Sequence, residues 1–183
     1  CYMDTEQERQ QRAIEKARQI IEEAEKRRDS VRSVSGLEQF RNGSFEILKS
    51  SEASDNLAKF LYKKYLNEGP ASLAIYLERL RDGTLDEDLT IRESALITLC
   101  RICSSIKTTE DIETLKKIHI ILVNWLRKEQ TYLSGYGVAC KQIQDIARLM
   151  LSEGMWKEVE PLMMTIYQIQ NGILKKNQAI QGI

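Results

Sequence analysis

The sequence predicts an all-α protein built from antiparallel helical hairpins in a repeat-like (α-solenoid-like) or bundle arrangement, preceded by a long charged helix. Turn-forming residues are scarce, with 2 Pro and 9 Gly among 183 residues. An all-β chain needs a turn every eight to twelve residues, and this composition does not supply them. Apolar residues also recur at helical spacing between recognisable helix-capping signals. Six or seven helices are expected.

The first predicted helix runs from Asp4 to about Arg32 and is rich in Glu, Gln, Lys and Arg. Its apolar stripe is narrow, and Arg28 stands where the stripe would continue. The stripe has alternating steps of three and four residues and consists of Ile14, Ala17, Ile21, Ala24 and Val31. Such a stripe buries little in isolation, so it needs either a second copy in a coiled coil or the body of its own domain.

The segment Ser30–Gly36 mixes Ser, Val and Gly and is expected to end this helix. We therefore predict a charged arm over residues 1–35, serving as a spacer or coiled-coil arm, and a helical-hairpin domain over residues 36–183. Residues 36–50 contain several apolar side chains around Asn42-Gly43, which indicates a short helix or an irregular packed segment.

The first helix pair is predicted over residues 54–82. Ser54 is the expected N-cap of its first helix, and Gly69-Pro70 stops that helix and begins the next. Gly83 is expected to end the second helix. Two helices joined by a Gly-Pro turn indicate a helical hairpin.

The second pair is predicted over residues 91–130. Thr90 and Glu93 match a capping box, and Glu110 and Asp111 place negative charge where the next helix begins. That next helix contains the densest apolar run of the chain, residues 118–126. Its apolar residues fall on two neighbouring faces, as expected of an inner helix with partners on both sides.

The third pair is predicted over residues 138–176, with Gly154 as a C-terminal cap between its helices. Pro161 lies early in the last helix, which therefore either starts near Val159 or bends. The expected inward face comprises Leu162, Met163, Ile166, Ile169, Ile173 and Leu174. The three pairs begin roughly 37 and 47 residues apart, close to the period of helical-hairpin repeats.

Charge and hydropathy narrow the classes of partner. Lys+Arg and Asp+Glu both number 27, so no net field attracts nucleic acid, and no nucleic-acid partner is expected. No stretch approaches the eighteen apolar residues of a membrane span. Four cysteines in this length favour a reducing compartment, and a cytoplasmic location is expected. The first residue, Cys1, leaves three alternatives: a fragment boundary, a lipid-bearing cysteine, or the end of a removed membrane helix.

Cys100-x-x-Cys103 is the one spacing that suggests metal or redox chemistry, with His119, Cys140 and carboxylates as further zinc ligands. Both cysteines fall mid-helix, where they are more often small buried hydrophobes. A redox pair would need a helix N-terminus to depress the thiol pKa. His119, the only histidine, lies in the most apolar helix, so a packed histidine with one hydrogen-bonded ring nitrogen is the expected role.

Two charged segments are also predicted to be non-functional. Asp86, Glu87 and Asp88 precede a helix, where acidic side chains are ordinarily solvated and favourable to the helix dipole. The segment 62–65, Tyr-Lys-Lys-Tyr, with Lys59 nearby, interleaves bases and aromatic rings as a nucleic-acid surface does. An amphipathic helix whose lysines extend into solvent explains it better.

No catalytic, cofactor-binding or metal-binding residue is therefore predicted, and no cofactor is expected. The expected function is a non-enzymatic helical interaction or scaffold module, whose partner is a protein or a second copy bound through the N-terminal helix. The first alternative is a soluble helical domain of a larger membrane-attached or signalling protein, with membrane attachment upstream of Cys1. The second is a metal or redox protein that uses Cys100 and Cys103.

Overall fold

The computed structural model describes the backbone of residues 5–181 and the side chains of residues 5–23, 36–164, 166–168 and 171. Every regular element in this part of the chain is a helix, which confirms the predicted all-α class. Seven α-helices and two short 3-10 helices follow one another along these residues. None of the described helices combines the length and apolarity needed to cross a membrane.

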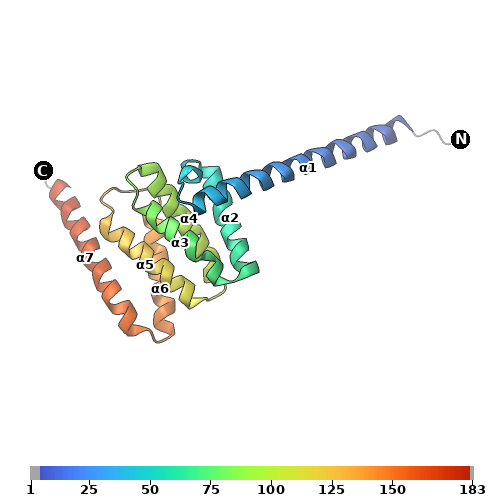
Figure 1. Ribbon diagram of the computed structural model, residues 1–183. Helices are drawn as coiled ribbons and strands as arrows, with labels where there is room; N and C mark the ends of the chain where they lie inside the picture. Colours follow the sequence, from blue (N-terminus) through green and yellow to red (C-terminus); the bar gives the residue numbers. More distant parts are fainter. Residues whose placement is uncertain (1–4, 182–183) are drawn as a thin grey trace.

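Helix α1 (Glu6–Arg41) projects from one side of the helical body, and α7 (Trp156–Gln181) lies on the opposite side (Figure 1). The hydroxyl of Thr5 caps the start of α1 by accepting from the backbone N–H of Glu8. The predicted end at Ser30–Gly36 is wrong, because α1 continues to Arg41. Its last turn is held by the body: Phe40 is fully buried, with its ring stacked 6.5 Å from that of Tyr76. The burial of Ala24, Arg28 and Val31 lies outside the described side chains.

After α1 the chain forms the 3-10 helix η1 (Glu46–Lys49), α2 (Ser51–Glu68), the 3-10 helix η2 (Pro70–Leu73) and α3 (Ala74–Thr84). The predicted cap at Ser54 is wrong, since the hydroxyl of Ser50 accepts from Ala53 N and Ser54 is buried one turn into α2. Gly83 does not end α3 either, because the helix continues to Thr84. Helices α2 and α3 both pack mainly against α4 rather than against each other.

Helix α4 (Leu89–Lys107) lies at the centre of the fold, in contact with α2, α3, α5 (Ile112–Lys128) and α6 (Tyr136–Ser152). Asp88 caps α4, accepting from Thr90 N at 2.8 Å, so the predicted cap at Thr90 is two residues too late. Glu93, the expected second member of the capping box, instead hydrogen-bonds the hydroxyl of Ser134. The Asp88 carboxylate satisfies the backbone N–H groups of Thr90 and Ile91, which have no partner within the helix.

Helix α5 has the two buried faces expected of an inner helix, and Leu115, Ile118, Leu122 and Trp125 are each 1% exposed or less. It packs against α6 and α7 as well as α4. Gly154, with φ 77°, closes the turn between α6 and α7 as predicted. Helix α7 begins at Trp156 with Pro161 inside it, and Val159 and Ile166 are buried. Met163, predicted to face inward, is 41% exposed, while the side chains of Ile169, Ile173 and Leu174 are outside the described set.

Candidate functional site

The two cysteines of the CxxC spacing are core residues of α4. Cys100 is 3% exposed and Cys103 is fully buried. Burial raises the pKa of each thiol to about 12, and for Cys100 the neighbouring thiols of Cys103 and Cys140 add to this effect. The Cys103 thiol donates to Oε1 of Gln142 at 3.4 Å. Both thiols are therefore protonated at neutral pH, which makes them poor nucleophiles and poor metal ligands.

His119 is fully buried on α5, as the sequence predicts. Its Nε2 lies 3.2 Å from the backbone oxygen of Ile143 on α6, so Nε2 carries the proton and donates it. The other ring nitrogen, Nδ1, has no hydrogen-bond partner. Burial lowers the pKa of His119, and the hydrogen bond to Ile143 opposes this shift. The ring is thus neutral and joins α5 to α6.

The structure does not bring the other predicted candidates into a metal site. Over the described residues, no group of three or more His, Cys, Asp or Glu side chains converges as a metal site requires. In the acidic run, the Asp86 carboxylate accepts from Asp88 N at 2.8 Å, and Asp88 caps α4. These two carboxylates hold the loop before the helix.

The segment of alternating aromatics and lysines on α2 is partly internal. Tyr65 is 7% exposed, and its hydroxyl donates to Oδ2 of Asp111 at 2.8 Å. Lys64 pairs with Glu68 at 2.9 Å, and the Lys59 ammonium lies 3.2 Å from Asp55. Acidic neighbours thus compensate two of the three lysines, which reduces the attraction this surface offers to a phosphate backbone.

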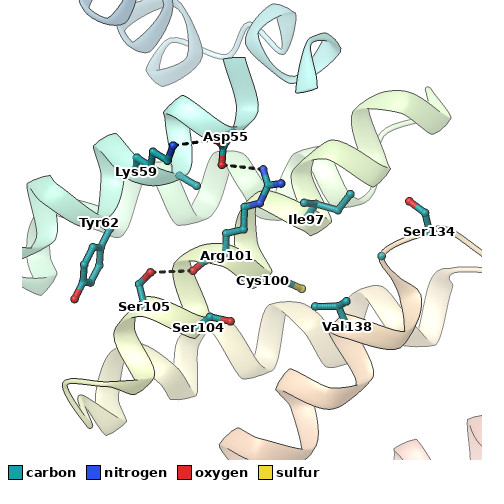
Figure 2. A pocket seen from close by; sticks show the side chains of 12 residues that line it. Asp55, Lys59, Tyr62, Ile97, Cys100, Arg101, Ser104, Ser105, Ser134 and Val138 are labelled. Carbon is teal, nitrogen blue, oxygen red and sulfur yellow. Dashed lines mark hydrogen bonds and ion pairs between the residues drawn. The ribbon is translucent and has the colours of Figure 1, made fainter. Parts of the chain in front are cut away.

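A groove of about 730 Å³ lies between α2, α4 and the start of α6. Figure 2 shows its side chains, which come from three segments distant in sequence. The lining comprises Asp55, Ala58, Lys59, Tyr62, Ile97, Cys100, Arg101, Ser104, Ser105, Ser134, Gly135 and Val138. Its volume falls within the range of sites that hold a ligand or a few side chains of a partner.

The apolar part of the groove is formed by Ile97 and Cys100 of α4 and Val138 of α6. Val138 is 53% exposed, so an apolar side chain is available to an incoming ligand. Gly135 allows this arrangement, because a Cβ there would lie 3.2 Å from side-chain atoms of both Leu96 and Ile97. The turn before α6 can therefore lie directly on α4.

Charge is concentrated on one side of the groove. The Asp55 carboxylate lies 3.2 Å from Lys59 Nζ and 3.2 Å from an Arg101 guanidinium nitrogen (Figure 2). The side chains of Lys59 and Arg101 are 74% and 48% exposed. Two cations share one carboxylate within the lining, and the Glu93 carboxylate next to the groove accepts from the lining residue Ser134.

The hydroxyl groups of the lining are engaged within the protein. Ser104 Oγ accepts from Gln142 Nε2 at 2.7 Å, Ser105 Oγ donates to the backbone oxygen of Arg101 at 3.2 Å, and Ser134 bonds to Glu93. The lining contains no histidine that could take a proton from a serine. What the groove offers chemically is an apolar floor beside a partly compensated pair of cations.

Large apolar side chains are also exposed on two helices at opposite sides of the body. On α1, Ile14, Ile20 and Ile21 are 56–60% exposed. On α7, Trp156 and Tyr167 are 65% and 63% exposed. Aromatic and aliphatic side chains left open in this way are typical of contact surfaces.

No protein family, curated protein or solved structure shows a match to this chain. Sequence reasoning did not find the groove, whose charged pair Asp55 and Arg101 are 46 positions apart. In the sequence, Lys59 and Tyr62 stand out only as members of a basic and aromatic segment. The groove follows from the packing of α2 and α6 on α4, which leaves no local signal in the sequence.

Proposed function

We propose that the chain is a non-enzymatic helical interaction module that binds an acidic, amphipathic segment of a protein partner in the groove between α2, α4 and α6. The observation that carries the proposal is the combination of an exposed apolar floor at Val138 with two cations that share Asp55. A helical segment could place an apolar residue on the floor and a carboxylate against Arg101 and Lys59.

Two observations support a binding function: the overall charge is neutral, and the residues that could have carried metal, redox or catalytic chemistry are buried. The thiols of Cys100 and Cys103 and the ring of His119 lie in the core. Side chains that a partner could contact are instead found in the groove and among the exposed apolar residues of α1 and α7. Contact surfaces of this kind, on a helical scaffold, suit partner binding.

The proposal includes a repeat-like arrangement of the body. Its support is that the consecutive helices α2 to α7 follow one another from one side of the molecule to the other (Figure 1), with α2 and α3 joined through α4 rather than packed on each other. Further along this series, α5 packs on α6. Stacked helix pairs of this type commonly present a groove lined by successive first helices, and here α2, α4 and α6 line it.

The test is a titration of the ¹⁵N-labelled protein with a short amphipathic helical peptide of Leu, Ala and Glu, followed by NMR. The matched probe has Lys in place of Glu. We expect the acidic peptide to shift the amide signals of Arg101, Ser105 and Val138, and the basic peptide to do so much less. Equal effects from the two peptides, or no shift in the groove at about 1 mM peptide, would overturn the proposal.

Two variants separate groove binding from non-specific attraction. Arg101→Glu reverses the charge at the rim, and Val138→Asp removes the apolar floor while placing an acid in the first turn of α6, where the helix dipole tolerates it. Both should lose binding. Arg148→Glu alters an exposed arginine of α6 outside the groove and should retain binding.

A further inference from the structure

The projecting helix α1 presents an apolar stripe that the body does not cover. Ile14, Ile20 and Ile21 are 56%, 60% and 57% exposed, whereas Phe40, at the C-terminal end of α1, is fully buried against the body. Figure 1 shows the N-terminal part of α1 extending away from all other helices. A second helix packed along these three isoleucines would remove their apolar side chains from water.

We propose that α1 pairs with α1 of a second copy in an antiparallel two-helix coil, in the register whose two-fold axis crosses the helix pair at the level of residue 19. In a heptad assignment with Ile14 and Ile21 at position a, Ala17 and Ala24 occupy position d. In the antiparallel register, Ile14 lies opposite Ala24 of the other copy, and Ile21 lies opposite Ala17. Each large residue thus meets a small one, which is the pattern that fills space between close helices.

The remaining exposed isoleucine supports the same orientation. Ile20 occupies position g, and g residues face g residues across an antiparallel pair. Near the two-fold axis, Ile20 of one copy would therefore lie against Ile20 of the other. A parallel pair would instead set Ile20 beside Glu25, an apolar side chain against an acid.

Charge also favours the antiparallel pair. In a parallel pair Arg28, at position a, would face Arg28 of the other copy, and Arg27 would face Arg32. Like charges at facing positions destabilise a pair. The antiparallel register places Arg28 opposite Gln10 and leaves Arg18 facing itself at the rim, where the Glu15 carboxylate of its own helix lies 3.9 Å away. The charges of α1 therefore favour the antiparallel orientation over the parallel one.

This inference adds a self-association surface to the proposed interaction function and does not depend on the groove, since α1 contributes no residue to the groove. The consequence is a dimer with its two bodies at opposite ends of the paired arms. Peptide titration tests the groove and sedimentation tests the arm, so the two ideas can fail separately.

The first experiment is sedimentation equilibrium of the full chain from about 1 µM to about 1 mM, the range of weak specific contacts. We expect a reversible monomer–dimer equilibrium. Ile21→Glu should weaken association by about tenfold or more, whereas Gln19→Glu, which adds the same charge on the opposite face of α1, should change it by less than about twofold. A strictly monomeric chain, or equal effects of the two substitutions, would overturn the proposal.

The second experiment determines orientation by spin-label distance measurement in a Cys1→Ser, Cys140→Ala background, in which Cys100 and Cys103 are buried and unreactive. A label at Gln7→Cys should give about 36 Å between copies in the antiparallel register, at about 1.5 Å per residue, but about 10 Å in a parallel pair. A label at Arg18→Cys, close to the two-fold axis, should give a short distance in either case and so reports that pairing occurs. A short distance at both positions would refute the antiparallel arrangement.

Discussion

Arg92 and Glu129 form a two-point ion pair that joins the start of α4 to the end of α5. Arg92 Nε lies 3.1 Å from Oε2 and Nη2 lies 3.4 Å from Oε1 of Glu129. The side chain of Glu129 is 3% exposed, and it also accepts from Trp125 Nε1 at 3.1 Å. Arg92 Nη1 donates to the backbone oxygens of residues 86 and 87. This ion pair therefore joins α4 to the end of α5, and Arg92 also holds the loop that precedes α4.

Removal of Glu129 should leave the largely buried Arg92 guanidinium without a compensating carboxylate and Trp125 Nε1 without its acceptor. We expect Glu129→Ala to lower the free energy of unfolding by about 3–5 kcal/mol. The control is Glu46→Ala, which removes an ion pair with Lys49 whose side chains are 72% and 53% exposed and should cost about 1 kcal/mol or less. Urea unfolding measures both. If Glu129→Ala costs the same in an Arg92→Met background, the two side chains are not coupled and the pair is not what holds this region.

Gly83 of α3 lies close against Ala95 of α4. A Cβ at this position would lie 2.9 Å from Ala95 Cβ and 3.2 Å from Leu48 Cδ1. We expect Gly83→Ala to lower the free energy of unfolding by about 1–3 kcal/mol, because both neighbours belong to packed helices. Adding Ala95→Gly should restore part of the loss. A Gly83→Ala variant as stable as the wild type would show that α3 can shift without cost.

A matched glycine provides the control for that prediction. Gly137 lies in the first turn of α6, and nothing would lie within 4 Å of a Cβ there. Gly137→Ala should therefore raise the free energy of unfolding by up to about 1 kcal/mol through reduced entropy of the unfolded chain.

Leu122 and Ile120 compare the inner and outer faces of α5. Leu122 is fully buried and Ile120 is 44% exposed. Leu122→Ala should lower the free energy of unfolding by about 2–5 kcal/mol, whereas Ile120→Ala should cost about 1 kcal/mol or less. Thermal and urea unfolding of the two variants check this. A loss at Leu122 well below 1 kcal/mol would mean that α5 is peripheral.

The positions of the helices could be predicted from the sequence because a helix that buries one face carries apolar residues at helical spacing. This spacing is pronounced in α5. The buried roles of His119 and the two cysteines of α4 were predicted for the same reason. The end of α1 was not, because its last turn is stabilised by the stacking of Phe40 on Tyr76, a contact between residues 36 positions apart. Tertiary packing overrides local propensity there.

Cap positions and the groove show two further limits of local signals. Asp88 and Thr90 are both acceptable caps, and the loop conformation that places Asp86 against Asp88 decides between them. The groove depends on where α2 and α6 lie on α4, and the central position of α4 itself is set by packing. Interhelical geometry of this kind is not written in the spacing of residues along one helix.

His119 should make the stability of the protein depend on pH between neutral and mildly acidic conditions. Burial lowers its pKa in the folded state below the ordinary value of 6.5, so the unfolded chain takes up a proton first as the pH falls. The stabilising contribution is therefore complete above about pH 6.5 and declines as the pH falls toward the folded-state pKa, by at most about 1.4 kcal/mol per pH unit. Urea unfolding at a series of pH values measures this slope.

His119→Gln, which keeps a donor for the Ile143 oxygen but does not titrate, should flatten the dependence of stability on pH. The acidic residue Asp111, whose pKa is lowered from 3.8 by its hydrogen bonds despite burial, acts only at lower pH and does not obscure this window. An unchanged slope in His119→Gln would show that the buried ring is protonated as readily in the folded protein as in the unfolded chain.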